Sequence, residues 1–472
     1  MKIKKYNKNK LTHKNIILLM LVIISLCLVI NVSSQVKEEW VARYHGPGNF
    51  MDGAEAIAVD NWGNVYVSGW SYGLGTERDY ATIKYNSIGI EQWVTRYSGS
   101  EGVNGWDSAY AIVTDSQGNI YVTGKVQDSG TYFDYATIKY NNSGAQQWVA
   151  IYNGTGNGED RAHDIALDIL GNIYVTGVSW DSGTSYDYAT IKYNSLGEEQ
   201  WVTRYNGQLN AEDWAYAIAV DSSGNVYVTG RSKGSEFCFD YATIKYDSDG
   251  VEQWVARYYS SEDRDDYAYD IAVDNEGNVY VTGLSSLSGI SYDYATVKYN
   301  SLGVEQWVAR YNGPGNSYDE ANAIAIDISG NVYVTGYSSG GSETHFDYAT
   351  IKYNSSGIEQ WVARYNGPGN DDDKAYAIAL DSSENIYVTG YSDGLETNRD
   401  YATIKYNSAG MEKWVARYDS PANSQDEAYA IAIDSSGNVY VTGMSSGSGT
   451  YDYATIKYSQ NVAVNQNIWM NY

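Results

Sequence analysis

Aspartate is the residue type whose spacing in this 472-residue chain points most clearly to chemistry. One aspartate recurs eight times in the motif Asp-x-Ala, at intervals of 53 to 55 residues. The eight are Asp52, Asp107, Asp160, Asp213, Asp266, Asp319, Asp373 and Asp426. Carboxylates brought together by a fold concentrate cations, and oxygen-only ligands favour Ca²⁺ over transition metals. The alternative is a structural role, in which each carboxylate accepts backbone N–H bonds and caps a loop.

Other residue types do not have the spacing of a catalytic or metal site. The four histidines show no metal-ligand spacing, and the chain contains no Gly-x-Ser-x-Gly elbow or phosphate-binding glycine loop. An arginine recurs in seven of eight Trp-Val-x-Arg-Tyr motifs, with Ile151 at the eighth position. We expect each of these arginines to pair with a neighbouring acid. The sequence therefore predicts no catalytic residue and no organic cofactor, and leaves calcium as the candidate ion.

The elements that must position the aspartates are the strands of one repeated unit. The copy over residues 319–365 contains NAIAID, NVYVTG, YATIKY and WVARY, four short β-branched or aromatic runs bounded by Gly, Asn, Asp or Ser. This pattern predicts strands, which we call A, B, C and D, in an antiparallel meander. Along strand A, Ala321, Ala323 and Ala325 alternate with Ile324 and Ile326, so we expect a shallow face to stack on a bulky one.

Each strand type occurs eight times, but the chain opens with a D strand and finishes with a C strand. A unit that cannot bury its apolar face alone needs neighbours on both sides. We therefore predict an all-β, eight-bladed β-propeller of four-stranded antiparallel blades. The first D strand, Trp40 to Tyr44, would complete the last blade and close the ring. With strand A innermost, the eight aspartates would circle the mouth of the central channel.

The ends of the chain differ from the repeats. Residues 1–34 contain six lysines, no acid and the apolar run Ile16 to Ile30, a pattern typical of a secretory signal peptide. The run is shorter than the roughly 20 residues of a membrane span, so we expect none in the mature chain. The propeller is predicted over residues 35–458, followed by a C-terminal tail over 459–472.

Composition restricts the partners. The chain carries 31 Lys and Arg against 58 Asp and Glu, a formal net charge of −27, and loss of the lysine-rich start makes it more negative. Nucleic acid is a poor partner for such a molecule. Without residues 1–34 the only cysteine is Cys238, so no intrachain disulfide can form. We expect a secreted or cell-envelope monomer that is stabilised by strand packing.

The two faces of the predicted ring differ in their loops. The A–B and C–D turns keep one length in every copy, whereas the B–C and D–A loops change in length and composition. We call the face formed by the B–C and D–A loops the variable face and the opposite one the constant face. Binding residues of repeat scaffolds usually lie on loops that are free to vary. The variable face is therefore the predicted binding face.

The motif AIAxDxxGNVYVTG followed by DYATIKYNxxGxxQWVARY resembles the bacterial β-propeller repeat family of the SBBP type, over residues 40–458. That family is often described as seven-bladed, whereas this chain has eight units. The run ATIKYNSLGVEQW, from Ala295 to Trp307, is more loosely similar to the tryptophan-docking repeats of eight-bladed quinoprotein-like propellers. The second resemblance implies that the eight tryptophans pack between neighbouring outer strands.

These observations favour a non-catalytic binding or scaffold module that meets an extracellular protein or glycan on its variable face. The alternative is an exported quinoprotein-like oxidoreductase. Resemblance to those enzymes implies adjacent cysteines and long insertions around a cofactor pocket, and this chain has neither. We therefore expect no enzymatic activity.

Overall fold

The computed structural model describes residues 35–99, 105–127, 132–235, 238–260, 264–286, 291–341, 345–447 and 449–461. These residues form 32 β-strands and no helix. Within these ranges there is accordingly no helix long and apolar enough to cross a membrane. The predicted signal peptide and residues 462–472 of the predicted tail lie outside the described residues.

The strands form eight sheets of four strands, confirming the predicted count. Blade 1 contains β2 (Asp52–Val59), β3 (Val65–Tyr72), β4 (Arg78–Tyr85) and β5 (Glu91–Tyr97). Blade 2 contains β6 (Ser108–Thr114), β7 (Ile120–Val126), β8 (Asp134–Tyr140) and β9 (Gln146–Tyr152). Blade 3 contains β10 (Asp160–Leu167), β11 (Ile173–Asp181), β12 (Ser185–Tyr193) and β13 (Glu199–Tyr205). Blade 4 contains β14 (Asp213–Val220), β15 (Val226–Lys233), β16 (Phe239–Tyr246) and β17 (Glu252–Tyr258).

The second half of the ring repeats this order. Blade 5 contains β18 (Asp266–Val273), β19 (Val279–Ser286), β20 (Tyr292–Tyr299) and β21 (Glu305–Tyr311). Blade 6 contains β22 (Asp319–Ile326), β23 (Val332–Ser339), β24 (Phe346–Tyr353) and β25 (Glu359–Tyr365). Blade 7 contains β26 (Asp373–Leu380), β27 (Ile386–Asp393), β28 (Arg399–Tyr406) and β29 (Glu412–Tyr418). Blade 8 contains β30 (Asp426–Ile433), β31 (Val439–Ser446), β32 (Tyr451–Asn461) and β1 (Gln35–Tyr44).

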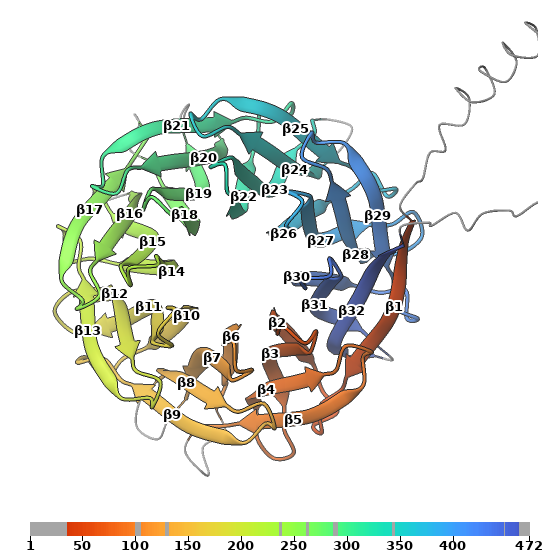
Figure 1. Cartoon of the computed structure of the whole chain (residues 1–472), viewed down its shortest axis with the longest axis horizontal. Coiled ribbons are helices and arrows are strands. Elements are labelled where there is room, and N and C mark those ends of the chain that lie inside the picture. Colours follow the sequence, from red (N-terminus) through yellow and green to blue (C-terminus); the bar gives the residue numbers. More distant parts are fainter. Residues whose placement is uncertain are drawn as a thin grey trace, which may run out of the picture. The chain divides into compact units, whose positions relative to one another are not determined.

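Figure 1 shows the blades around a central axis, with strand A of each blade innermost, from β2 in blade 1 to β30 in blade 8. Blade 8 has the strand order β1-β32-β31-β30, so the N-terminal strand supplies its outer edge as predicted. The closure is reinforced by Arg43 of β1, whose guanidinium lies 3.1 Å from the Asp452 carboxylate of β32. Closure in this way covers the outer edge that β32 would otherwise expose.

The tryptophans bind each blade to the next. Trp307 of β21 donates from Nε1 to the carbonyl of Ser355 in the C–D turn of blade 6, at 3.1 Å. The following Gly357 has φ +79°, and a Cβ there would stand 2.6 Å from the Trp307 ring. Only glycine combines this backbone conformation with such a close approach to an aromatic ring. This contact has the geometry that the tryptophan-docking resemblance implies.

At blade 8 the C–D turn is absent, because β1 comes from the other end of the chain. There β32 continues three residues beyond the predicted end at Tyr458. Gln460 contacts the Lys405 ammonium and donates to the Gly437 carbonyl at 3.0 Å. In the preceding blade Lys352 donates to the Ser408 carbonyl of a C–D turn. Gln460 therefore replaces the missing turn as the partner of the lysine, whereas Trp414 Nε1 has no hydrogen-bond partner among the described residues.

The predicted alternation of strand A is wrong at one position, because every innermost strand contains a β-bulge. In β22 the pairing with β23 skips Asn322, between Ala321 and Ala323. The bulge reverses the parity, so that Ala321 joins Ile324 in one interblade cluster instead of facing away from it. A bulge adds one residue without a change of composition, so period-2 reasoning misses it. Its consequence is that residue 322 and its seven equivalents have no partner in the strand pairing, and the Asn322 side chain instead donates to the Ala375 carbonyl of the next blade at 2.8 Å.

Candidate functional site

The eight Asp-x-Ala aspartates lie at the starts of the innermost strands, but their side chains are buried. None is more than 1% exposed. Asp319 is representative, since its Oδ2 accepts the N–H of Gly313 at 2.8 Å and its Oδ1 that of Ser339 at 3.0 Å. All eight accept a backbone N–H from the D–A loop that precedes them. These are the contacts of a loop cap, and they join the D–A loop to the end of strand B in most blades.

Burial changes the protonation of this ring of aspartates. It raises the pKa of Asp107 and of Asp266 to about 6 and that of Asp373 to about 7. A C-strand aspartate of the preceding blade adds to the rise, as Asp347 does for Asp373. The negative charge of the C-strand aspartate therefore favours the protonated form of the Asp-x-Ala aspartate at these blade junctions.

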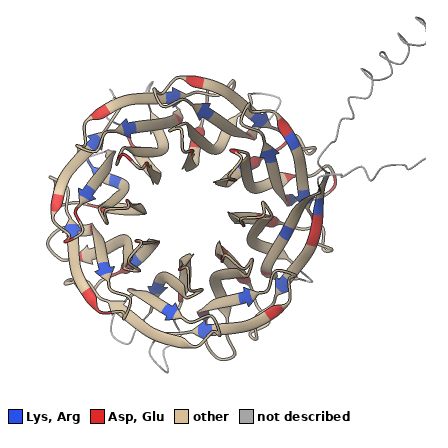
Figure 2. Cartoon of the chain, viewed as in Figure 1, with Lys and Arg blue, Asp and Glu red and all other residues tan. Residues whose placement is uncertain are grey.

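The arginines of the Trp-Val-x-Arg-Tyr motif stabilise these junctions, as predicted. Arg204 places Nη2 2.9 Å from Oδ2 of Asp187 and donates from Nη1 to Ser179 Oγ and to Tyr152 OH of the preceding blade. The seven arginines make the same contacts around the ring. Basic residues accordingly recur in the outer half of the blades in Figure 2. In blade 2 the arginine and the serine are replaced together, by Ile151 and Val126.

The bulge residues form a second ring that the sequence analysis did not identify. They are Glu55, Tyr110, His163, Tyr216, Tyr269, Asn322, Tyr376 and Tyr429, and we call them the inner collar. All eight are half-buried and lie on the strands that surround the axis in Figure 1. Six of them are aromatic. The position is visible in the sequence as the residue that follows the alanine of Asp-x-Ala, and it varies from blade to blade.

Side chains of the inner collar contact their neighbours across blades. The His163 ring stacks on Tyr216 with centroids 5.7 Å apart, and Tyr216 lies 5.8 Å from Tyr269. Tyr376 lies 5.7 Å from Tyr429 in the same way. Such ring pairs present large apolar surface together with hydroxyl groups that can hydrogen-bond a ligand.

Burial raises the pKa of every tyrosine of the inner collar, and it also shifts the pKa values of Glu55 and His163. Burial raises the pKa of Glu55 to about 7, against the hydrogen bond from Trp70 and the charge of Arg78. Burial lowers the pKa of His163 to about 4, so the imidazole is neutral at pH 7. His163 Nδ1 lies 2.6 Å from the Ala215 carbonyl, which only accepts, so Nδ1 carries the proton and Nε2 remains an acceptor.

Cations stacked on aromatic rings surround the collar towards the variable face. The Arg78 guanidinium lies 3.9 Å from the Trp70 ring centroid and 4.9 Å from that of Trp106, a residue of a D–A loop. Arg231 lies 4.6 Å from Phe239 and 4.8 Å from Trp214. Trp, Tyr and Arg are the residues that dominate binding energy at protein interfaces. The candidate site is therefore the inner collar with these surrounding residues.

The geometry defines the class of protein as a closed eight-bladed β-propeller with constant strands and one variable end. Six segments match the beta-propeller repeat SBBP, at residues 147–183, 200–237, 253–286, 306–342, 360–395 and 422–449. The chain therefore belongs to the SBBP-type β-propeller repeat family, as the motif predicted.

Two curated relatives share less than 30% sequence identity with this chain. An uncharacterized WD repeat-containing protein of Acanthamoeba polyphaga mimivirus is 22% identical over 468 residues, which cover 80% of this chain and 31% of that protein. The regulatory protein FlaEY of Caulobacter vibrioides is 29% identical over 147 residues, which cover 26% of this chain and 15% of that protein. The chain thus spans less than a third of either relative.

Solved structures with a similar arrangement match this chain with TM-scores below 0.5. A protein of unknown function from Dyadobacter fermentans has a TM-score of 0.41 at 10% identity, covering 90% of this chain and 99% of that chain. A eukaryotic initiation factor has a TM-score of 0.43 at 7% identity, covering 79% of each chain. Similarities of this size say nothing about function.

Proposed function

We propose that this propeller is an exported, non-catalytic binding module that engages an extracellular protein or glycan at the variable-face end of its axis. The observation that carries the proposal is the inner collar. Eight nearly identical inner strands differ at the collar position and at the residue two before it, and these variable positions hold aromatic, acidic and basic side chains. A scaffold that keeps its strands constant and varies one ring of half-buried side chains has the design of a repeat protein's binding surface.

The chemistry of these side chains indicates the class of ligand. Tyrosines and tryptophans stack on flat apolar surfaces, while Glu55, Arg78 and Arg231 supply charged hydrogen bonds beside them. Both sugar rings and aromatic-rich protein surfaces fit this combination.

The test is a glycan array, followed by affinity measurements on two matched tryptophan variants. Trp106 lies on the variable face with 48% of its surface exposed, and Trp62 lies in an A–B turn on the constant face with 59% exposed. Truncating a binding hot spot costs about 2 kcal/mol or more, which weakens Kd roughly 30-fold. We expect Trp106→Ala to show that loss and Trp62→Ala to bind like the parent chain. Equal affinity in both variants would contradict the proposed face.

A second measurement addresses catalysis. The purified chain would be incubated with calcium and pyrroloquinoline quinone and assayed for dye-linked alcohol oxidation. We expect no turnover above that of the free quinone. Turnover that follows the protein concentration would contradict the non-catalytic function and favour the quinoprotein-like alternative.

A further inference from the structure

Three blades carry a cation on an aromatic ring at one pair of positions beside the B–C loop, on the variable face. The first position follows the glycine of strand B, and the second precedes the aspartate of strand C. The pairs are Trp70 with Arg78 in blade 1, Lys125 with Phe133 in blade 2, and Arg231 with Phe239 in blade 4. The cation lies 3.9, 4.0 and 4.6 Å from the ring centroid, respectively. We call them the cation–aromatic pairs.

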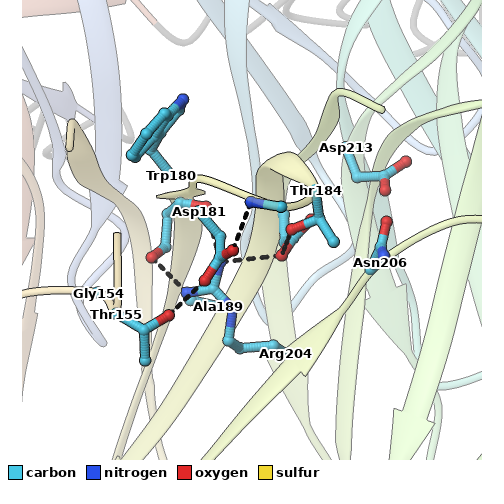
Figure 3. A network of polar contacts seen from close by, with 12 residues as sticks. Gly154, Thr155, Trp180, Asp181, Thr184, Ala189, Arg204, Asn206 and Asp213 are labelled. Carbon is cyan, nitrogen blue, oxygen red and sulfur yellow. Dashed lines mark hydrogen bonds and ion pairs between the residues drawn. The ribbon is translucent and has the colours of Figure 1, made fainter. Parts of the chain in front are cut away.

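The cations of these pairs differ from the other half-buried arginines, which bind an acid. The seven arginines of the Trp-Val-x-Arg-Tyr motif each contact an aspartate, and Figure 3 shows one of them, Arg204, in its network of polar contacts. Blade 7 has an equivalent pair, with the Arg399 guanidinium 4.3 Å from the Tyr391 ring, but Arg399 also contacts the Glu427 carboxylate. The half-buried cations of the three cation–aromatic pairs form no side-chain hydrogen bond or ion pair with a described residue.

Acids near the cation–aromatic pairs are bound by other groups. Glu55 accepts the indole N–H of Trp70 at 2.9 Å, and Asp265 accepts the backbone N–H of Phe239 at 3.0 Å. Glu159 contacts the arginine of β10. An aromatic face holds a guanidinium or an ammonium in place but leaves its N–H groups without acceptors. Three cations are thus oriented without a bound acid in a chain whose formal net charge is −27.

The three cation–aromatic pairs lie within four consecutive blades. Blade 3, between the second and the third pair, has Val178 and Tyr186 at these positions. Blades 5, 6 and 8 have no cation there, and Glu427 neutralises the cation of blade 7. Blades 1 to 4 follow one another around the axis in Figure 1. A ligand that meets all three pairs must therefore extend over several blades and carry negative groups along its length.

We propose that the cation–aromatic pairs bind an acidic glycan, a sugar polymer that carries carboxylate or sulfate groups, along blades 1 to 4. This inference rests on the proposed function and names the class of its ligand. A guanidinium donates two parallel N–H bonds to a planar or tetrahedral anion, and the ring beside it offers a flat apolar face to the adjoining sugar. The same pair on several blades fits a polymer in which charge and ring recur together. An acidic peptide would match the charges alone.

The test compares dextran sulfate with neutral dextran, which share one sugar backbone. Titration calorimetry of the full chain should show that dextran sulfate binds, against the net charge of the protein, and that dextran binds far more weakly. Added NaCl should weaken the binding of dextran sulfate. Arg231→Gln should weaken it roughly 10-fold, because one charge-assisted contact is lost. Arg231→Lys keeps the charge without the planar fork and should bind with intermediate affinity.

The matched control is Arg399→Gln, which removes the same charge from a guanidinium that is stacked in the same way but already bound to Glu427. It should bind dextran sulfate like the parent chain. The inference is overturned if dextran sulfate does not bind, if dextran binds equally well, or if Arg231→Gln and Arg399→Gln have equal affinities. Polyglutamate that binds as tightly as dextran sulfate would overturn it in favour of an acidic protein.

The proposed function has a separate readout. A loss of affinity for an array ligand in Trp106→Ala but not in Trp62→Ala supports the variable face whatever the charge of that ligand. If this difference is found and dextran sulfate does not bind, only the acidic class of ligand is wrong. If dextran sulfate binds and the two tryptophan variants are alike, the proposed face is wrong.

Discussion

The Gly357→Ala substitution tests the physical basis of blade docking. Gly357 has φ +79°, and a Cβ there would meet the Trp307 ring at 2.6 Å, well inside van der Waals contact. A left-handed backbone costs an L-residue about 1–2 kcal/mol. To remove the clash, Trp307 must leave its site between Tyr280 and Tyr353 and lose its hydrogen bond to Ser355. Displacing a packed indole costs about 3 kcal/mol more.

The matched variant is Gly437→Ala in the A–B turn of blade 8. Gly437 has the same φ of +79°, but a Cβ there would have nothing within 4 Å. It therefore carries only the backbone cost, which the lower entropy of the unfolded chain offsets by about 0.4–1 kcal/mol. We expect urea unfolding followed by tryptophan fluorescence to show a loss several-fold larger for Gly357→Ala. Equal losses in the two variants would refute the docking account and leave backbone strain as the whole effect.

Three further predictions follow from the structure. Burial raises the pKa of Asp373 from 3.8 to about 7, so the folded state binds the proton of this carboxyl more tightly than the unfolded chain does. The contribution of Asp373 to the free energy of unfolding therefore falls as pH rises from about 4 to about 7. Asp373→Asn should flatten that part of the pH profile of unfolding free energy, although Asp347 and Arg417 remain beside it, and an unchanged slope would contradict the shifted pKa. Glu384 has φ 58° where the other seven A–B turns have glycine, so Glu384→Gly should raise stability by about 0.5–1 kcal/mol in urea titrations, and a loss would contradict the strain. Deletion of residues 35–44 should expose the edge of β32, lower the melting temperature and promote association in size-exclusion chromatography, and an unchanged melt would contradict closure by β1.

The architecture was predictable because the same four-strand sequence pattern recurs eight times. Each strand pattern, each Asp-x-x-Gly-Asn turn and each tryptophan recurs, so the number of blades and the closure by Trp40 to Tyr44 follow from counting. The capping contacts of Asp319 and its equivalents also follow from ordinary turn chemistry.

The candidate site was not predictable, because it depends on one extra residue per blade. A bulge at Asn322 and its equivalents reverses the side-chain parity of the following residues and frees one residue from the strand pairing, yet it leaves the repeat length and composition unchanged. In the sequence, only the variation of residue 55 and its equivalents from blade to blade indicates the inner collar.

The most direct test of the central claim is hydrogen–deuterium exchange of the full chain with and without the ligand that a glycan array or an envelope pull-down identifies. Binding at the variable face predicts protection in the D–A loops and at the starts of β6, β10, β14 and β18, where Tyr110, His163, Tyr216 and Tyr269 lie. The A–B turns, including Trp62, should exchange at the same rate in both samples. Protection confined to the A–B turns would contradict the claim that the inner collar and its variable loops form the binding site.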